Sequence, residues 1–258
     1  RDIWNDPNST DWEYIGSGDL TVNEADSITF NEVSVSDGSI DFSAQQDITA
    51  GAVSSNYGDE GENAVSIVSA NGSINMTSAI AYGDLTVEAP GDLVAESVQA
   101  IGPGSNAWLT SYQANLIIPE QDSGTAFDVG NEMYLFAADN IDLGGKLSAG
   151  KLIDIEAGKN VTTVDMETTD AGGRILLDIG ETFSAAGTAT SPVTFSAAES
   201  IELEAGGDVL LDGVELTGVG ASSTNIVDLI AHGTAAGTTG NIDLRGGLFF
   251  FREELSID

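Results

Sequence analysis

Apolar and polar residues alternate along most of the chain in short segments, separated by Gly, Asn, Asp or Ser. The segment at 199–218, ESIELEAGGDVLLDGVELTG, shows the alternation twice and turns on glycine each time. A period of two is typical of a β-strand with one buried face, and no apolar stripe with helical spacing continues along the chain. With acids outward and glycines at corners, four residues of this segment are expected to point inward: Ile201, Leu203, Val209 and Leu211.

The alternating unit recurs with a regular spacing. Its apolar anchors Leu20, Ile28, Ile40 and Ile48 lie 8, 12 and 8 residues apart, which closes a period of 20 residues. A fixed period favours a solenoid over antiparallel hairpins, because each coil must return in register above the last. The sequence therefore predicts an all-β fold, a single-stranded parallel β-helix with coils of about 20 residues. The repeat breaks at 51–66 and 101–132, which we expect to be loops inserted between coils.

The two ends depart from the repeat, so we divide the chain into an aromatic N-terminal cap (1–15), the β-helix (16–245) and a C-terminal strand or cap (246–258). A solenoid has an unpaired sheet edge at each end. One alternative is that each atypical segment covers the end of its own rod. The other is that it adds a strand to the edge of the next subunit. A head-to-tail contact that does not close into a ring builds filaments. The candidate contact residues are Trp4, Trp12, Tyr14, Leu248, Phe249, Phe250, Phe251 and Leu255.

Charge narrows the range of partners. The chain has 42 acidic residues against 7 basic ones, a formal net charge of −35. Such a surface repels nucleic acid and anionic membranes, and it attracts hard cations, Ca²⁺ above all. No cofactor is required, and a solvated acidic face is the alternative to specific cation sites. The candidate metal ligands are the loop acids Asp59, Glu60 and Glu62 and the corner acids Asp19, Asp26, Asp84 and Asp92.

Reactive side chains are scarce. The chain has no cysteine, which excludes disulfides and thiolate metal sites, and its single histidine, His232, lies in no nucleophile motif. Carboxylate pairs suited to glycoside hydrolysis are numerous, but aromatic sugar platforms and basic residues are few. We therefore expect no enzyme activity. No apolar run is long enough to span a bilayer, and the start at Arg1 reads as that of a mature, processed chain.

The runs AADNIDLGGKLSAGKLIDIEAGKNVTT (137–163) and SAAESIELEAGGDVLLDGVELTG (196–218) share a G-x-[ILV]-x-[ILV]-x-A-G cadence and, in the first, an LSAG link. In this repeat style the chain resembles the repeat region of filamentous-haemagglutinin-type adhesins, over roughly 16–100 and 137–245. The resemblance implies a right-handed parallel β-helix, secretion, and a role in adhesion or surface structure.

Taken together, these observations predict a secreted structural protein, located outside the cell or on its surface, that assembles with itself into a filament or coat. The alternative is a monomeric surface adhesin that binds glycans or matrix through inserted loops, using Tyr57, Trp108 and Tyr112. The third and weakest alternative is a β-helix enzyme that degrades polysaccharides.

Overall fold

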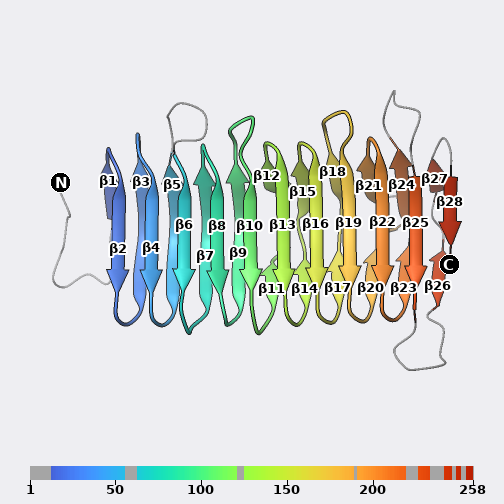
Figure 1. Ribbon diagram of the computed structural model, residues 1–258, viewed down its shortest axis with the longest axis horizontal. Coiled ribbons are helices and arrows are strands. Elements are labelled where there is room, and N and C mark those ends of the chain that lie inside the picture. Colours follow the sequence, from blue (N-terminus) through green and yellow to red (C-terminus); the bar gives the residue numbers. More distant parts are fainter. Residues whose placement is uncertain are drawn as a thin grey trace.

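The computed structural model describes residues 13–55, 63–120, 125–188, 191–218, 226–232, 241–245, 248–250 and 254–257. These residues form a parallel β-solenoid of about nine turns, with no helix in the described ranges. The strands stack in chain order along a rod, with the first strands, β1 and β2, at one end and the last, β28, at the other (Figure 1). The predicted all-β parallel β-helix is therefore confirmed.

One side of the rod is an eleven-stranded parallel sheet, which we call the first face. Each of its strands pairs with the strand before and after it in the stack, and β2 and β28 are outermost. In order, the strands are β2 (Leu20–Glu24), β4 (Ile40–Ala44), β6 (Val65–Ser69), β8 (Leu85–Ala89), β10 (Ala107–Ser111), β13 (Glu132–Ala137), β16 (Leu152–Ala157), β19 (Arg174–Ile179), β22 (Ser200–Ala205), β25 (Ile226–Ala231) and β28 (Glu254–Ile257).

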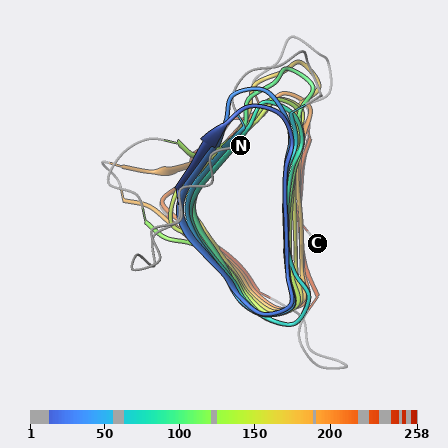
Figure 2. The same cartoon turned by 90° about the vertical axis from the view of Figure 1, so that its left-hand side faces the viewer.

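The other two sides belong to one seventeen-stranded sheet, which gives the rod a three-sided outline when viewed along its axis (Figure 2). Near the N-terminus one long strand per coil crosses both sides: β3 (Ile28–Val35), β5 (Ile48–Ser55), β7 (Ile74–Ala81) and β9 (Leu93–Ala100). Beyond β9 each coil has two shorter strands instead, and the first two of these, β11 and β12, both pair with β9.

We call the two sides the second face and the third face. The second face continues from the first half of β9 through β11 (Leu116–Ile118), β14 (Ile141–Leu143), β17 (Val161–Thr163), β20 (Phe183–Ala186), β23 (Val209–Asp212) and β26 (Ile242–Arg245). The third face begins with β1 (Glu13–Gly16) and continues from the second half of β9 through β12 (Thr125–Val129), β15 (Lys146–Ala149), β18 (Met166–Thr168), β21 (Val193–Ala197), β24 (Val214–Gly218) and β27 (Leu248–Phe250).

The core consists of rows of apolar side chains that run the length of the rod. Parallel register places equivalent residues directly above one another, so an inward position in one coil is inward in the next. The inward prediction for 199–218 is confirmed, because its four named residues are at most 2% exposed whereas the intervening Leu210 is 39% exposed. Nine successive positions of one row on the first face are at most 1% exposed: Ile40, Val65, Leu85, Ala107, Met133, Ile153, Ile175, Ile201 and Val227.

The 20-residue period is correct for some coils and too short for others. Leu20 pairs with Ile40 and Ile141 pairs with Val161, as the spacing predicts. Other coils are longer: the side chain of Arg174 bonds Ser200 of the next coil, 26 residues away. Because the strands stay in register, the additional residues lie at the corners of the coils. The sheet registers are thus preserved while corner lengths vary.

The prediction of an inserted loop at 101–132 is wrong. Three strands, β10, β11 and β12, lie inside this range and continue all three faces. Leu109, Leu116 and Phe127 are fully buried in these strands. The polar and glycine-rich stretches between them resemble loops because they form long corners. Most of the other break, at 51–66, lies either in β5 or at 56–62, outside the described residues.

Candidate assembly surface at the ends of the rod

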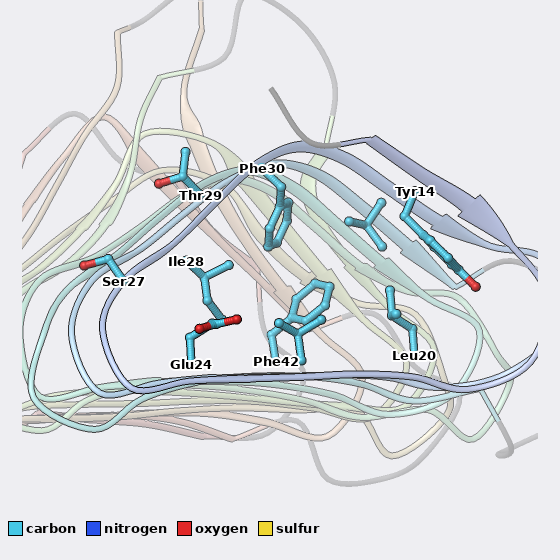
Figure 3. Close-up of a pocket in the computed structure, with 10 residues that line it drawn as sticks. Tyr14, Leu20, Glu24, Ser27, Ile28, Thr29, Phe30 and Phe42 are labelled. Carbon is cyan, nitrogen blue, oxygen red and sulfur yellow. The ribbon is translucent and has the colours of Figure 1, made fainter. Parts of the chain in front are cut away.

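The first coil is open at the N-terminal end of the rod. A cavity of about 270 Å³ enters its apolar interior there, between the strands of the first and second faces (Figure 3). Phe30 and Phe42 lie side by side in this interior with ring centroids 4.7 Å apart, and Leu20 lies beside them. Tyr14 lines the same cavity from β1. In the described part of the chain, the N-terminal end therefore has an opening lined mainly by apolar core residues.

The opening arises because the first coil has no described coil above it. In the described part of the chain, β2 pairs only with β4, and β1 pairs only with β3. Leu20 and Val22 are half-buried, whereas Ile40 and Phe42, one coil further on, are each only 1% exposed. An edge of this kind has free backbone donors and acceptors beside uncovered apolar side chains, which is the usual template for adding a strand.

The predicted contact residues divide between the two ends of the rod. Tyr14 lines the N-terminal cavity, as described above. Leu248, Phe249 and Phe250 form β27, and Leu255 lies in β28 at the other end. These two strands pair in parallel with β24 and β25, so they continue the stack. Trp4, Trp12 and Phe251 lie outside the described residues.

Corner acids predicted as calcium ligands bond the backbone of the following coil. Oδ1 of Asp19 accepts the N–H of Ser39 at 2.9 Å, and Asp84 and Asp92 accept the N–H of Asn106 and Asn115 at 2.9 and 3.1 Å. Among the described residues the Asp26 side chain makes no such bond, and its backbone carbonyl accepts the N–H of Gln46 at 3.2 Å instead. In the described ranges no group of three or more acidic or histidine side chains is placed to hold a metal ion. Asp59, Glu60 and Glu62 lie outside those ranges, so calcium binding there stays a prediction.

The corner that holds Asp92, before the strands of the second face, carries a column of asparagines that the sequence reasoning missed. Asn115, Asn140 and Asn160 each precede a strand of the second face, and each donates its side-chain N–H to the residue before it in the column. The distances are 2.9 Å to Asp92, 2.9 Å to Asn115 and 3.0 Å to Asn140. The signal in the sequence is an Asn or Asp directly before an apolar strand start, at coil spacing.

Aromatic residues also gather on the outer surface of the first face. The rings of Trp108 and Tyr134 stack with centroids 5.8 Å apart and an interplanar angle of 2°. Tyr134 donates its hydroxyl to Glu132 at 2.5 Å; this hydrogen bond, and then burial, raise the pKa of Tyr134 to about 12. Tyr112, 51% exposed, donates to Glu88 at 2.9 Å. Tyr57, the third predicted adhesin residue, lies outside the described ranges.

Beyond Tyr134 the first face becomes acidic. A shallow groove there is lined by Asp154, Asp178, Glu202, Glu204 and Asp228. Burial raises the pKa of Asp154 above its ordinary value, the charge of Asp178 raises it further, and Arg174 opposes them. The groove is flanked by an ion pair between Arg174 and Glu202 at 3.2 Å and by a hydrogen bond between Nε2 of His232 and Oε1 of Glu204 at 2.7 Å.

Comparison of the chain with protein-family models, curated proteins and solved structures finds no match. The structure is consistent with a β-helix repeat protein, and the finer resemblance to filamentous-haemagglutinin-type repeats stays a prediction. Within the described ranges, no helix has the length and apolar character needed to cross a membrane.

Proposed function

We propose that this protein is a secreted structural subunit that assembles head to tail into an extracellular filament or surface coat. The observation that carries the proposal is the open first coil: its apolar interior lies at one end of the stack, and among the described residues the terminal strands at both ends pair on one side only. Exposed edges and apolar core favour association. The two ends differ, so the contact is heterologous and extends without closing.

Location and cation dependence belong to the same proposal. The acidic surface suits a protein outside the cell, where salt screens the repulsion between subunits, and the absence of cysteine does not argue against export. Calcium, held by acids such as Asp59, Glu60 and Glu62, is the cation expected to promote contact between acidic rods. Negative-stain imaging with and without Ca²⁺ tests this part.

A charge placed inside the open coil tests the assembly. Val22 lines the cavity, whereas the neighbouring Thr21 is exposed on the outer surface of the same strand. We expect the wild-type protein to form uniform filaments, Val22→Lys to be a folded monomer, and Thr21→Lys, with the same added charge, to assemble. Sedimentation and negative-stain imaging measure assembly, and far-UV circular dichroism checks the fold. A wild-type protein that stays monomeric at high concentration would overturn the proposal.

The stacked pair Trp108 and Tyr134 favours a second candidate, a surface adhesin that binds glycans. Aromatic rings fixed on a rigid sheet present flat apolar area, and Glu88 and Glu132 supply hydrogen-bond acceptors beside them. In this case Trp108→Ala abolishes binding to a panel of soluble glycans, while Thr110→Ala on the same strand retains it. Binding that survives Trp108→Ala would exclude these rings as the site.

A further inference from the structure

We infer that the partner at the open first coil is the last coil of a second copy, joined so that every inward row continues across the junction. This inference rests on the proposed assembly and adds its register. It names which residues of the two copies lie opposite each other.

The first face defines the alignment. The register row that begins at Leu20 continues strand by strand through buried positions to Val227, and its last position is Leu255 in β28. The register row that begins at Val22 has Ile257 as its last position. If β28 of one copy pairs in parallel with β2 of the next, Leu255 lies opposite Leu20 and Ile257 opposite Val22.

The other two faces give the same alignment independently. On the second face, the row that starts at Ile28 ends at Ile242 in β26. On the third face, the row that starts at Tyr14 in β1 ends at Phe249 in β27. One junction therefore places apolar register positions opposite each other on all three sides, around the cavity of the first coil.

A register row on the third face that starts at an exposed residue, Ile15, also supports the junction. Ile15 is 75% exposed, an unusual place for a large aliphatic side chain at the edge of the fold. Its row runs through Ser34, Ser54, Ile80, Gln99, Asp128, Ser148, Glu167, Ser196 and Thr217, and it ends at Phe250. The row is largely polar along the rod and apolar at both ends. The junction makes Ile15 and Phe250 cross-strand neighbours, which is a favourable pair in a sheet.

Other registers lack this agreement. A slip of one residue moves every inward side chain to the opposite side of the sheet, so Leu255 would face Thr21. A slip of two residues in one direction leaves Leu20 beyond the start of β28. The same slip in the other direction places Leu20 opposite Ile257 and Ile28 opposite Leu244, but it leaves Val22 beyond the end of β28. Of these registers, the in-register junction brings the most apolar positions opposite each other, with Leu20, Val22, Ile28 and Tyr14 all paired.

The absence of cysteine allows a direct test by disulfide trapping. Thr21 and Ser256 lie in the same outer row of the first face, so the junction brings them opposite each other in different copies. Neighbouring strands lie about 4.8 Å apart, within the Cα separation of a disulfide, whereas a partner two residues further along exceeds the limit of about 7 Å. The test protein carries Thr21→Cys with Ser256→Cys, and the off-register control carries Asn23→Cys with Ser256→Cys.

Under mild oxidation we expect the first protein to lose its monomer band to a ladder of covalent oligomers on non-reducing gels. Peptide mapping should show a disulfide that joins positions 21 and 256 of different chains. The control should retain its monomer band, and so should Thr21→Cys alone. Filaments that crosslink equally well through the control pair overturn the register but not the assembly. A protein that stays monomeric by light scattering overturns both, and residues 1–12 of the same chain then become the candidate cover for the cavity.

Discussion

Asp and Asn side chains at the corners connect neighbouring coils by hydrogen bonds, a role that residue type alone does not predict. An Asp or Asn before a strand presents one oxygen to the backbone N–H of the next coil, as Asp92, Asn115 and Asn140 do in succession. Asparagine can also donate, so a column of asparagines continues from coil to coil. The acids at this corner were predicted to be cation ligands because carboxylates in a column should repel. In the structure, Asp92 is followed by asparagines instead.

Removal of one asparagine from the column should therefore destabilise the rod. In Asn140→Ala the N–H groups of Asn160 lose their acceptor and Asn115 loses a donor. We expect the free energy of unfolding to fall by about 1–3 kcal/mol, because partly buried polar groups are left unpaired. Urea denaturation measures the effect. Asp142→Ala, at an exposed position of the adjacent strand, is the control and should change little.

Asp154 should make stability depend on pH. Its pKa is raised in the fold, so the folded protein binds more protons than the unfolded chain, and stability falls as pH rises from the ordinary value of 3.8 through the folded pKa. Asp154→Asn removes this loss. We expect the variant to have a higher urea midpoint than the wild type at pH 7. The difference should disappear below the ordinary pKa, and a variant less stable than the wild type at pH 7 would contradict the argument.

At the scale of strands, alternation predicts which side chains face inward, and turn residues predict corners. The prediction succeeds at 199–218 because Ile201 and Leu203 alternate with acids between clear glycine corners. It fails at 101–132, where β11 has only three residues, too few to show a period, and long polar corners separate the strands. The coil lengths there depend on the number of residues in each corner, and the alternation of apolar and polar residues does not predict that number.

The reassigned strand β10 can be tested with a pair of neighbours. Leu109 is fully buried and Thr110 faces outward on the same strand. Leu109→Ala should lower the free energy of unfolding by about 2–5 kcal/mol, because it leaves a cavity in a close-packed core. Thr110→Ala should have a much smaller effect. Equal and small effects in urea denaturation would indicate that this segment is a surface loop after all.

For the whole molecule, the sequence could identify the ends but not the surface they form. Aromatic clusters in 1–15 and 246–258 mark both ends as atypical. The cavity at the first coil, however, involves Phe30 and Phe42, which belong to ordinary repeat units. They line the cavity only because of their place in the stack, and this place depends on pairing between coils. The register of a junction likewise depends on all three faces at once.

Assembly of such acidic rods should depend strongly on salt. Subunits with a formal charge of −35 repel each other at the ends as well as along the sides. Raising NaCl from about 0.1 M to about 1 M shortens the Debye length from about 10 Å to about 3 Å, so filaments should form at lower protein concentration. Light scattering across a concentration series measures this threshold. Val22→Lys should remain monomeric at both salt concentrations, and a threshold that rises with salt would contradict the electrostatic argument.

The direction of the hydrogen bonds has a mechanical consequence. In all three faces the strands lie across the rod, so the bonds between coils point along its axis. Tension applied through the two ends of one chain peels the outermost coil away from its neighbour before the next coil is strained. A coil with the 20-residue offset of Leu20 and Ile40 adds about 4.8 Å to the rod but reaches about 70 Å when extended. A subunit pulled in this way would therefore lengthen in steps under load and absorb work before it is fully extended.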